Sequence, residues 1–307
     1  MNDYKLLKSV GNRIRYFRKL QGLSQENFAF MCNLDRTYIS DIERGKRNVS
    51  LINLDIIATA LQIPLYKIFL NLPTKDLKLD FKLQNIYKIN NSFQINCGFH
   101  IDTADIVYSA LITSIQLEEL PFTLFDNIDL KSLSGIVGAF FINNLANKTN
   151  AIINPIEKGH PDIIPAHGKN ATEKQLRNFP AGLEVKCTVG NLKKDSFSKV
   201  GQKRLQILSS LTWQSHHREV ASLMGLVIDF SGNIINDKKY PIITGIFYSN
   251  QLNMDDWGKI SGITGRNTKV TGMLISGKEK MGKGWVILLN KKDYILRYES
   301  ILKFNSH

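Results

Sequence analysis

The first 70 residues carry apolar positions at helical spacing, broken by recognisable start and stop signals. An apolar residue recurs every three or four positions from Leu6 to Leu20, and Gly22 follows as a stop. Ser24 is placed to cap a second helix, and Asp35 a third that ends at Gly45. Two further apolar stripes follow, at residues 51–61 and 64–69. We therefore expect a domain of five short helices over residues 1–72.

Beyond this domain the hydrophobic pattern changes. Alternating charges predict a connector over residues 73–95, and the rest of the chain, residues 96–307, reads as one larger domain. Apolar stripes predict helices at residues 102–120, 130–145 and 199–208. Runs rich in β-branched and aromatic residues predict strands at residues 222–230, 242–249, 269–275 and 284–289. Helices followed by strands indicate an α/β or α+β domain.

One predicted strand carries candidate chemistry. Residues 182–189 alternate apolar and polar side chains, which places Glu184 and Lys186 on the same face. Asp162, preceded by Pro161, lies 22 positions before Glu184. In metal-assisted phosphodiester hydrolysis, carboxylates bind a hard divalent cation and a lysine orients or deprotonates the attacking water. The alternative interpretation is a surface ion pair on an edge strand.

Composition favours a polyanionic partner. The formal net charge is +13 and the isoelectric point is about 9.5, without a single basic tail. A solvated lysine-rich surface would give the same numbers. The three cysteines are far apart, which argues against disulfides and a zinc site. No signal peptide and no run of 18 apolar residues occurs, so we expect a cytoplasmic protein without membrane contact.

Two stretches, Gly22-Leu23-Ser24-Gln25-Glu26 and residues 37–45, strongly resemble the Cro/repressor-type (XRE) helix-turn-helix family over residues 5–71. The resemblance implies that the helix at residues 35–44 enters the major groove of double-stranded DNA. It places four side chains at base edges and three near phosphates, respectively Arg36, Thr37, Tyr38 and Ser40, and Gln25, Lys46 and Arg47. The alternative is a helical domain for protein contacts, but 11 Lys and Arg against 6 Asp and Glu in residues 1–72 favour DNA.

The pair Pro161-Asp162 and the tripeptide Glu184-Val185-Lys186 resemble the PD-(D/E)xK nuclease signature. The resemblance implies an α/β domain with a central mixed sheet and a catalytic set of Asp162, Glu184 and Lys186. It also implies that Asp162, Glu184 and the backbone carbonyl of Val185 or Cys187 bind Mg²⁺. A third acid is often found in this family, and Glu118, Glu119 and Glu157 remain open as candidates.

Together the two resemblances imply a type II restriction endonuclease, with an overall layout similar to the ApaLI-like enzymes. Cutting both strands of a duplex favours a homodimer on a palindrome. In the glycine- and lysine-rich stretch 258–283, we expect Arg266 or Asn267 to contact a base edge. One alternative is a transcriptional repressor whose C-terminal domain senses a ligand or dimerises. Another is a repair or recombination nuclease that recognises DNA structure.

Two weaker motifs remain. Residues 277–283 nearly match a phosphate-binding loop, but Gly284 stands where Ser or Thr would bind magnesium, and the next run predicts a strand. We therefore expect a basic hairpin turn there and no nucleotide cofactor. The pair His216-His217 beside Trp213 is compatible with a metal site or a DNA contact, although a structural or solvated role is favoured.

Overall fold

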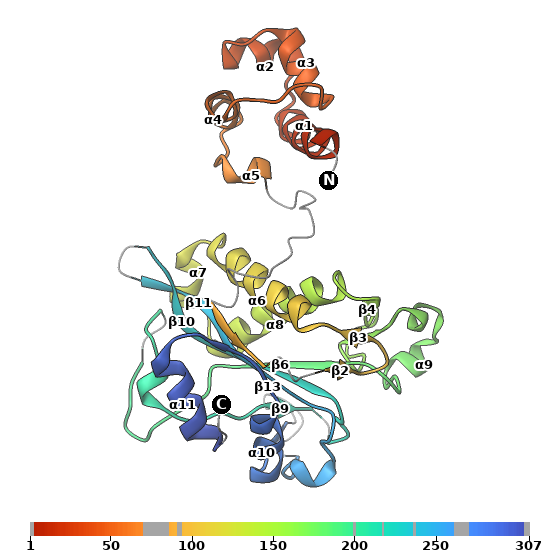
Figure 1. Ribbon diagram of the computed structural model, residues 1–307, viewed down its shortest axis with the longest axis vertical. Coiled ribbons are helices and arrows are strands. Elements are labelled where there is room, and N and C mark those ends of the chain that lie inside the picture. The colour runs from red at the N-terminus through yellow and green to blue at the C-terminus, as the bar shows by residue number, and fades with distance from the viewer. Residues whose placement is uncertain are drawn as a thin grey trace. The chain divides into compact units, whose positions relative to one another are not determined.

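The computed structural model describes residues 3–69, 86–90, 94–198, 201–216, 218–235, 238–260 and 270–303. The chain divides into two compact units, residues 1–79 and 80–307 (Figure 1).

The first unit contains the five helices that the sequence predicts. They are α1 (Asp3–Leu20), α2 (Gln25–Cys32), α3 (Arg36–Glu43), α4 (Leu51–Ala60) and α5 (Tyr66–Phe69). The Ser24 side chain caps α2 by accepting a hydrogen bond from the Asn27 backbone N–H. Apolar side chains from all five helices form one buried core, including Ile14, Phe28, Ile39, Ile57 and Ile68. The local signals therefore coincide with a packed domain.

The second unit is built on a five-stranded mixed sheet. Its order is β1 (Tyr87–Ile89), β13 (Trp285–Leu289), β11 (Lys238–Ser249), β10 (Leu223–Ile235) and β6 (Glu184–Thr188). Neighbouring strands are antiparallel except β6, which runs parallel to β10 with Glu184 opposite Leu223. The mixed sheet expected from the sequence is therefore present, and β6 lies at its edge.

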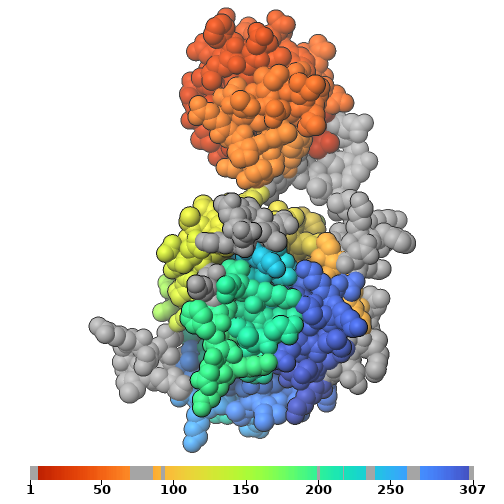
Figure 2. Space-filling model, turned by 90° about the vertical axis from the view of Figure 1, so that its left-hand side faces the viewer, coloured from red at the N-terminus to blue at the C-terminus, as the bar shows by residue number. Residues whose placement is uncertain are grey.

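Helices cover both faces of this sheet (Figure 1). On one face lie α6 (Thr103–Glu118), which contacts β11, and α8 (Leu130–Ala146), which contacts β6, and the short α7 (Phe122–Asn127) links them. On the other face lie α10 (Ile275–Lys283) and α11 (Lys292–Leu302), which contact β11 and β13. The space-filling view shows residues 201–216, in green, beside the blue α11 (Figure 2), where Lys203 pairs with Asp293.

Short elements complete the unit. The two-residue or three-residue strands are β2 (Ile95–Asn96), β3 (His100–Ile101), β4 (Ala151–Ile153), β5 (Ile163–Pro165), β7 (Asn191–Leu192), β8 (Leu208–Ser210), β9 (Gln214–Ser215) and β12 (Thr271–Gly272). The remaining helical pieces are α9 (Glu173–Leu176) and the 3₁₀ turns η1 (Ala166–Asn170), η2 (Leu205–Ile207) and η3 (Met254–Asp256). In the described ranges, every helix is too short or too polar to cross a bilayer.

Three sequence predictions about elements are wrong. The connector predicted over residues 73–95 contains β1, because Tyr87 is buried and its hydroxyl donates to the Ile243 carbonyl at 2.7 Å. The hairpin turn predicted at residues 277–283 is instead part of α10, which Met281 anchors in the core. Within the helix predicted over residues 199–208, the described residues 201–208 instead contain η2 and the start of β8, and the Asp229 carboxylate accepts the Arg204 backbone N–H there.

Candidate functional site

The exposed face of α3 forms the first candidate surface. The helix begins after Asp35, and Ile39 and Ile42 turn into the core. Because one side of the helix is buried, the opposite side faces outward, where Arg36 and Thr37 are exposed. Ser40, by contrast, is half-buried. The predicted base-reading residues therefore occupy one accessible stretch at the start of α3, with Ser40 at its margin.

A buried ion pair fixes α3 against the helices before it. The Arg18 guanidinium lies 2.5 and 3.0 Å from the two Glu43 carboxylate oxygens, and both side chains are almost fully buried. The Gln25 amide donates to the same carboxylate at 2.7 Å. Gln25 was expected at a phosphate, and its amide nitrogen is engaged inside the domain. The buried charges couple α1, the start of α2 and the end of α3.

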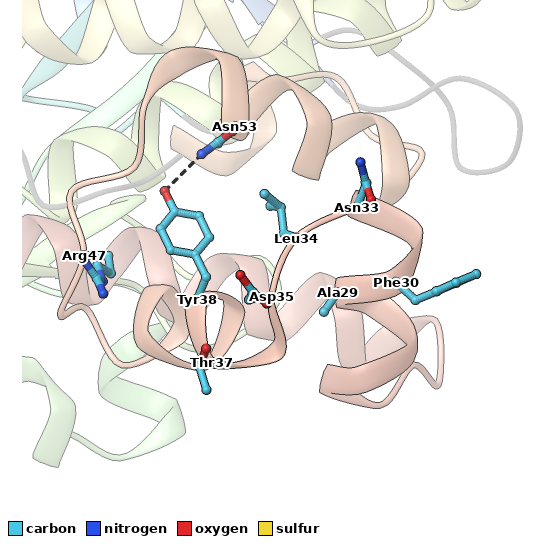
Figure 3. A pocket seen from close by; sticks show the side chains of 9 residues that line it. All are labelled: Ala29, Phe30, Asn33, Leu34, Asp35, Thr37, Tyr38, Arg47 and Asn53. Carbon is cyan, nitrogen blue, oxygen red and sulfur yellow. Dashed lines mark hydrogen bonds between the residues drawn. The ribbon is translucent and has the colours of Figure 1, made fainter.

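A hollow of about 830 Å³ lies beside this surface, between α2, α3 and the start of α4 (Figure 3). Tyr38 lines it, and its hydroxyl accepts a hydrogen bond from the Asn53 amide at 3.0 Å. The Arg47 guanidinium lies 6.0 Å from the Tyr38 ring centre. Arg47 also lies 3.6 Å from Asp41, and Lys46 is exposed. The lining of the hollow is therefore polar, and it carries charges of both signs in Arg47 and Asp35.

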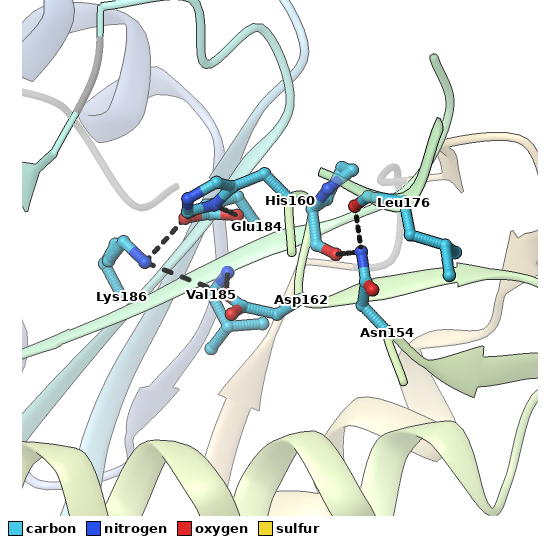
Figure 4. A network of polar contacts seen from close by, with 8 residues as sticks. Asn154, His160, Asp162, Leu176, Glu184, Val185 and Lys186 are labelled. Atoms are coloured by element: carbon cyan, nitrogen blue, oxygen red, sulfur yellow. Dashed lines mark hydrogen bonds and ion pairs between the residues drawn. The ribbon is translucent and has the colours of Figure 1, made fainter. Parts of the chain in front are cut away.

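The second candidate site is an acidic cluster at the N-terminal end of β6. Residue Ile163, at the start of β5, exchanges two backbone hydrogen bonds with Leu183, of 3.1 and 2.8 Å. This pairing brings Asp162 to the strand that carries Glu184 (Figure 4). The Asp162 carboxylate accepts the Val185 backbone N–H at 2.8 Å. A segment more than twenty residues upstream is thus fixed beside β6.

The three predicted catalytic side chains converge in this cluster. The Lys186 ammonium lies 2.6 Å from one Glu184 oxygen and 3.8 Å from an Asp162 oxygen. The Glu184 side chain is only 3% exposed, whereas Asp162 and Lys186 retain 25% and 23% exposure. Glu184 is therefore the enclosed member, and the other two line the side that solvent reaches.

The sequence analysis missed His160. Its Nδ1 atom lies 3.4 Å from both oxygens of the Glu184 carboxylate, one of which is also the partner of Lys186 (Figure 4). The turn that carries it is held by Asn154, whose amide donates to the carbonyls of Pro161 and Leu176 at 3.2 and 2.8 Å. The only signal in the sequence was the position of His160 directly before Pro161-Asp162.

The two carboxyl groups of the cluster differ in pKa. Burial and the negative charge of Glu184 raise the pKa of Asp162 to about 6. Burial also opposes ionisation of Glu184, but the His160 hydrogen bond and the Lys186 charge outweigh it and lower the pKa of Glu184. Burial lowers the pKa of Lys186, yet the two carboxylates outweigh it and raise that pKa. Lys186 is thus held as an ammonium, which suits it to orient a water molecule rather than deprotonate one.

The donor set suits a hard cation. Both carboxylates supply oxygen, and the buried Oε1 of Glu184 has the Lys186 ammonium as its ion-pair partner at 2.6 Å. In the described part of the chain, no three His, Cys, Asp or Glu side chains are arranged to hold a metal. A cation bound here would therefore need further oxygens, from water, a phosphate, or the backbone carbonyl of Val185 or Cys187.

Other predicted residues lie elsewhere. Arg266 and Asn267, expected at a base edge, fall outside the described residues, as does His217. Of the three candidates for a third acid, Glu118 and Glu119 lie at the C-terminal end of α6, and Glu157 is exposed. None of the contacts of the cluster described above involves one of these three glutamates.

Comparisons with known proteins concern the N-terminal part. A helix-turn-helix family model, HTH_3, matches residues 14–68. The control protein C.MunI of a Mycoplasma species is 51% identical over 70 residues, which cover 22% of this chain and 92% of the relative. The control protein C.BamHI of Bacillus amyloliquefaciens is 51% identical over 63 residues, which cover 20% of this chain and 75% of the relative. The solved restriction-modification controller protein C.AhdI of Aeromonas hydrophila is 49% identical, with 20% and 96% covered and a TM-score of 0.20.

Proposed function

Because the N-terminal domain of this chain belongs to the helix-turn-helix family, we propose that the protein is a site-specific endonuclease that this domain helps to place on double-stranded DNA. One observation carries the catalytic half of the proposal: Asp162, Glu184 and Lys186, which are distant in the sequence, meet at one end of β6. The family match ends at residue 68, so the function of the second unit rests on this geometry.

The chemistry of the cluster follows from its charges. Asp162 and Glu184 would hold Mg²⁺, which stabilises the negative charge that develops on a phosphodiester during hydrolysis. The Lys186 ammonium, held by both carboxylates, donates hydrogen bonds to an attacking water or to a phosphate oxygen. His160 contacts both oxygens of Glu184 and restrains that carboxylate beside Lys186. Each side chain thus has a distinct positional role.

The N-terminal domain supplies the DNA contacts in this proposal. Arg36 and Thr37 reach base edges from the exposed start of α3, and Lys46 and Arg47 meet phosphates. A homodimer would present two such helices and two clusters, which matches the two strands of a palindrome. Sedimentation of the protein, free and on DNA, tests that stoichiometry, and a monomer in both states would contradict it.

A second candidate function is transcriptional control without cleavage. The observation in its favour is that the relatives named above are control proteins, and that C.AhdI is a restriction-modification controller protein. Under this alternative, Glu184 and Lys186 form a structural ion pair, and the second unit senses a ligand or dimerises. Binding to an operator would then be the whole activity.

Plasmid cleavage distinguishes the two functions. Purified full-length protein is incubated with plasmid DNA and Mg²⁺, and the ends are sequenced. We expect defined ends, no cutting in excess chelator, and a loss of about 100-fold or more for Lys186→Met, in the range seen when one charge-stabilising donor is removed. The matched control is Glu173→Gln, which breaks an exposed ion pair with Arg177 in the same unit. Operator binding without cleavage by the wild-type protein would favour the control function.

The role of the N-terminal domain needs a separate test. If it binds the cleavage target, Arg36→Ala should slow cleavage at the recognition site or alter site preference. Any nicking of the plasmid at random sites, which does not depend on recognition, should be unaffected. If it binds a separate operator of the protein's own gene, the same variant should cut the same sites at the wild-type rate. We favour target binding, because a covalently attached domain raises the local concentration of the second unit near its sites.

A further inference from the structure

A cleft of about 400 Å³ lies between α8 and β6, next to the acidic cluster. One wall of the cleft consists of residues of α8, and another of Val185, Lys186 and Cys187 of β6. Gln214 and Ser215 of β9 also line it. Lys186 belongs to both the cleft and the cluster. Because β6 is the edge strand of the sheet, the cleft is open to a molecule that approaches the cluster from that side.

Two glycines keep the cleft open. The buried side of α8 packs against the sheet through Leu133, Val137 and Phe141, while Gly135 and Gly138 face the cleft. A Cβ atom built on either glycine meets no other atom within 4 Å. Glycine is among the poorest residues for the interior of a helix, and neither tight packing nor an unusual backbone angle requires it at these positions. A larger side chain at either position would therefore project into the cleft.

The lining combines two lysines with apolar side chains. Lys131, near the start of α8, and Lys186 supply positive charge, and the described lining residues include no carboxylate. Ala139, Ile142 and Val185 supply the apolar surface. A DNA strand has the complementary pattern, because charged phosphates alternate with deoxyribose rings whose faces are largely apolar. An uncharged ligand would not use the two ammonium groups.

We propose that this cleft receives the sugar–phosphate backbone of the DNA strand whose phosphate reaches Lys186. The deoxyribose lies over Gly135 and Gly138, and Lys131 pairs with a phosphate next to the one at Lys186. This inference rests on the proposed nuclease function, since the shared Lys186 connects the cleft to the cluster. It assigns a role in DNA binding to α8.

Filling the cleft tests the inference. Gly135→Leu and Gly138→Leu place a side chain in the empty volume, and Asn143→Leu places the same side chain on an exposed position of α8 outside it. The full-length proteins are compared in plasmid cleavage with Mg²⁺. They are also compared by hydroxyl-radical footprinting of DNA without metal, which does not depend on activity. Circular dichroism and thermal unfolding confirm that each variant is folded.

We expect both glycine variants to lose at least 10-fold in cleavage rate and to lose the protection that extends beyond the N-terminal domain's own site. Asn143→Leu should retain both. Wild-type cleavage and protection in either glycine variant would overturn the inference while leaving the proposed function intact. If no protein cleaves DNA, the proposed function fails, and the footprint alone decides: protection lost only in the glycine variants supports the cleft, and unchanged protection refutes it.

Discussion

The raised pKa of Asp162 implies that this carboxylate destabilises the fold at neutral pH. Burial and the nearby Glu184 raise the pKa of Asp162 from 3.8 to about 6. At 1.36 kcal/mol per pKa unit, the ionised form is less stable in the folded state by about 3 kcal/mol. The side chain keeps 25% exposure, so we expect Asp162→Asn to stabilise the second unit by about 1–2 kcal/mol at pH 8.

The substitution preserves the local contacts. The amide oxygen of an asparagine can still accept the Val185 backbone N–H, which Asp162 accepts at 2.8 Å. Lys186 keeps its closer partner, Glu184, at 2.6 Å. The variant therefore removes the charge while leaving the hydrogen bond and the main ion pair in place. In plasmid cleavage the same variant should be inactive, so it should gain stability as it loses function.

The pH dependence of stability shows the direction of the effect. Since folding raises the pKa of Asp162, the folded state binds the proton more tightly, and the wild-type protein gains stability as the pH falls through about 6. The advantage of Asp162→Asn should thus be full above pH 6 and should disappear towards pH 4. Below the unfolded pKa, both states carry a neutral group and the two proteins should unfold alike.

Urea unfolding followed by tryptophan fluorescence measures this free energy. All three tryptophans, Trp213, Trp257 and Trp285, lie in the second unit, so the signal reports on that unit alone. Experiments in chelator keep bound cations out of the comparison. The control, Asp126→Asn, removes an exposed carboxylate from the same unit. The reasoning fails if Asp162→Asn is less stable than wild type at pH 8, or if its advantage persists unchanged at pH 4.

Three further outcomes test the N-terminal domain. Glu43→Ala leaves the buried Arg18 charge unpaired and should destabilise the domain by about 3–5 kcal/mol, measured as loss of helical circular dichroism, while tryptophan fluorescence stays native. Lys46→Ala should lower affinity for every DNA sequence alike and reduce the logarithmic salt slope of binding by about one; an unchanged slope would exclude the phosphate contact. Gly11→Ala would press a methyl group against the Ile42 backbone carbonyl and should cost about 1–3 kcal/mol in thermal unfolding.

The sequence by itself determined what depends on near neighbours along the chain. The five N-terminal helices follow from apolar spacing and from caps such as Ser24, because helical hydrogen bonds join residues only four positions apart. The alternation in β6 likewise places Glu184 and Lys186 on one face, since side chains of a strand alternate. The roles of these residues remain proposals, but their local geometry was readable from the sequence.

Only the tertiary structure decided what depends on contacts between distant segments. Asp162 reaches the cluster because Ile163 pairs with Leu183, and His160 comes with it on the same turn. No local pattern encodes that pairing. The burial of Tyr87 likewise draws β1 into the sheet against the charged composition around it. The cleft beside α8 exists because packing fixes one side of that helix on the sheet and leaves its glycines facing β6, and packing energy is gained only when the segments meet.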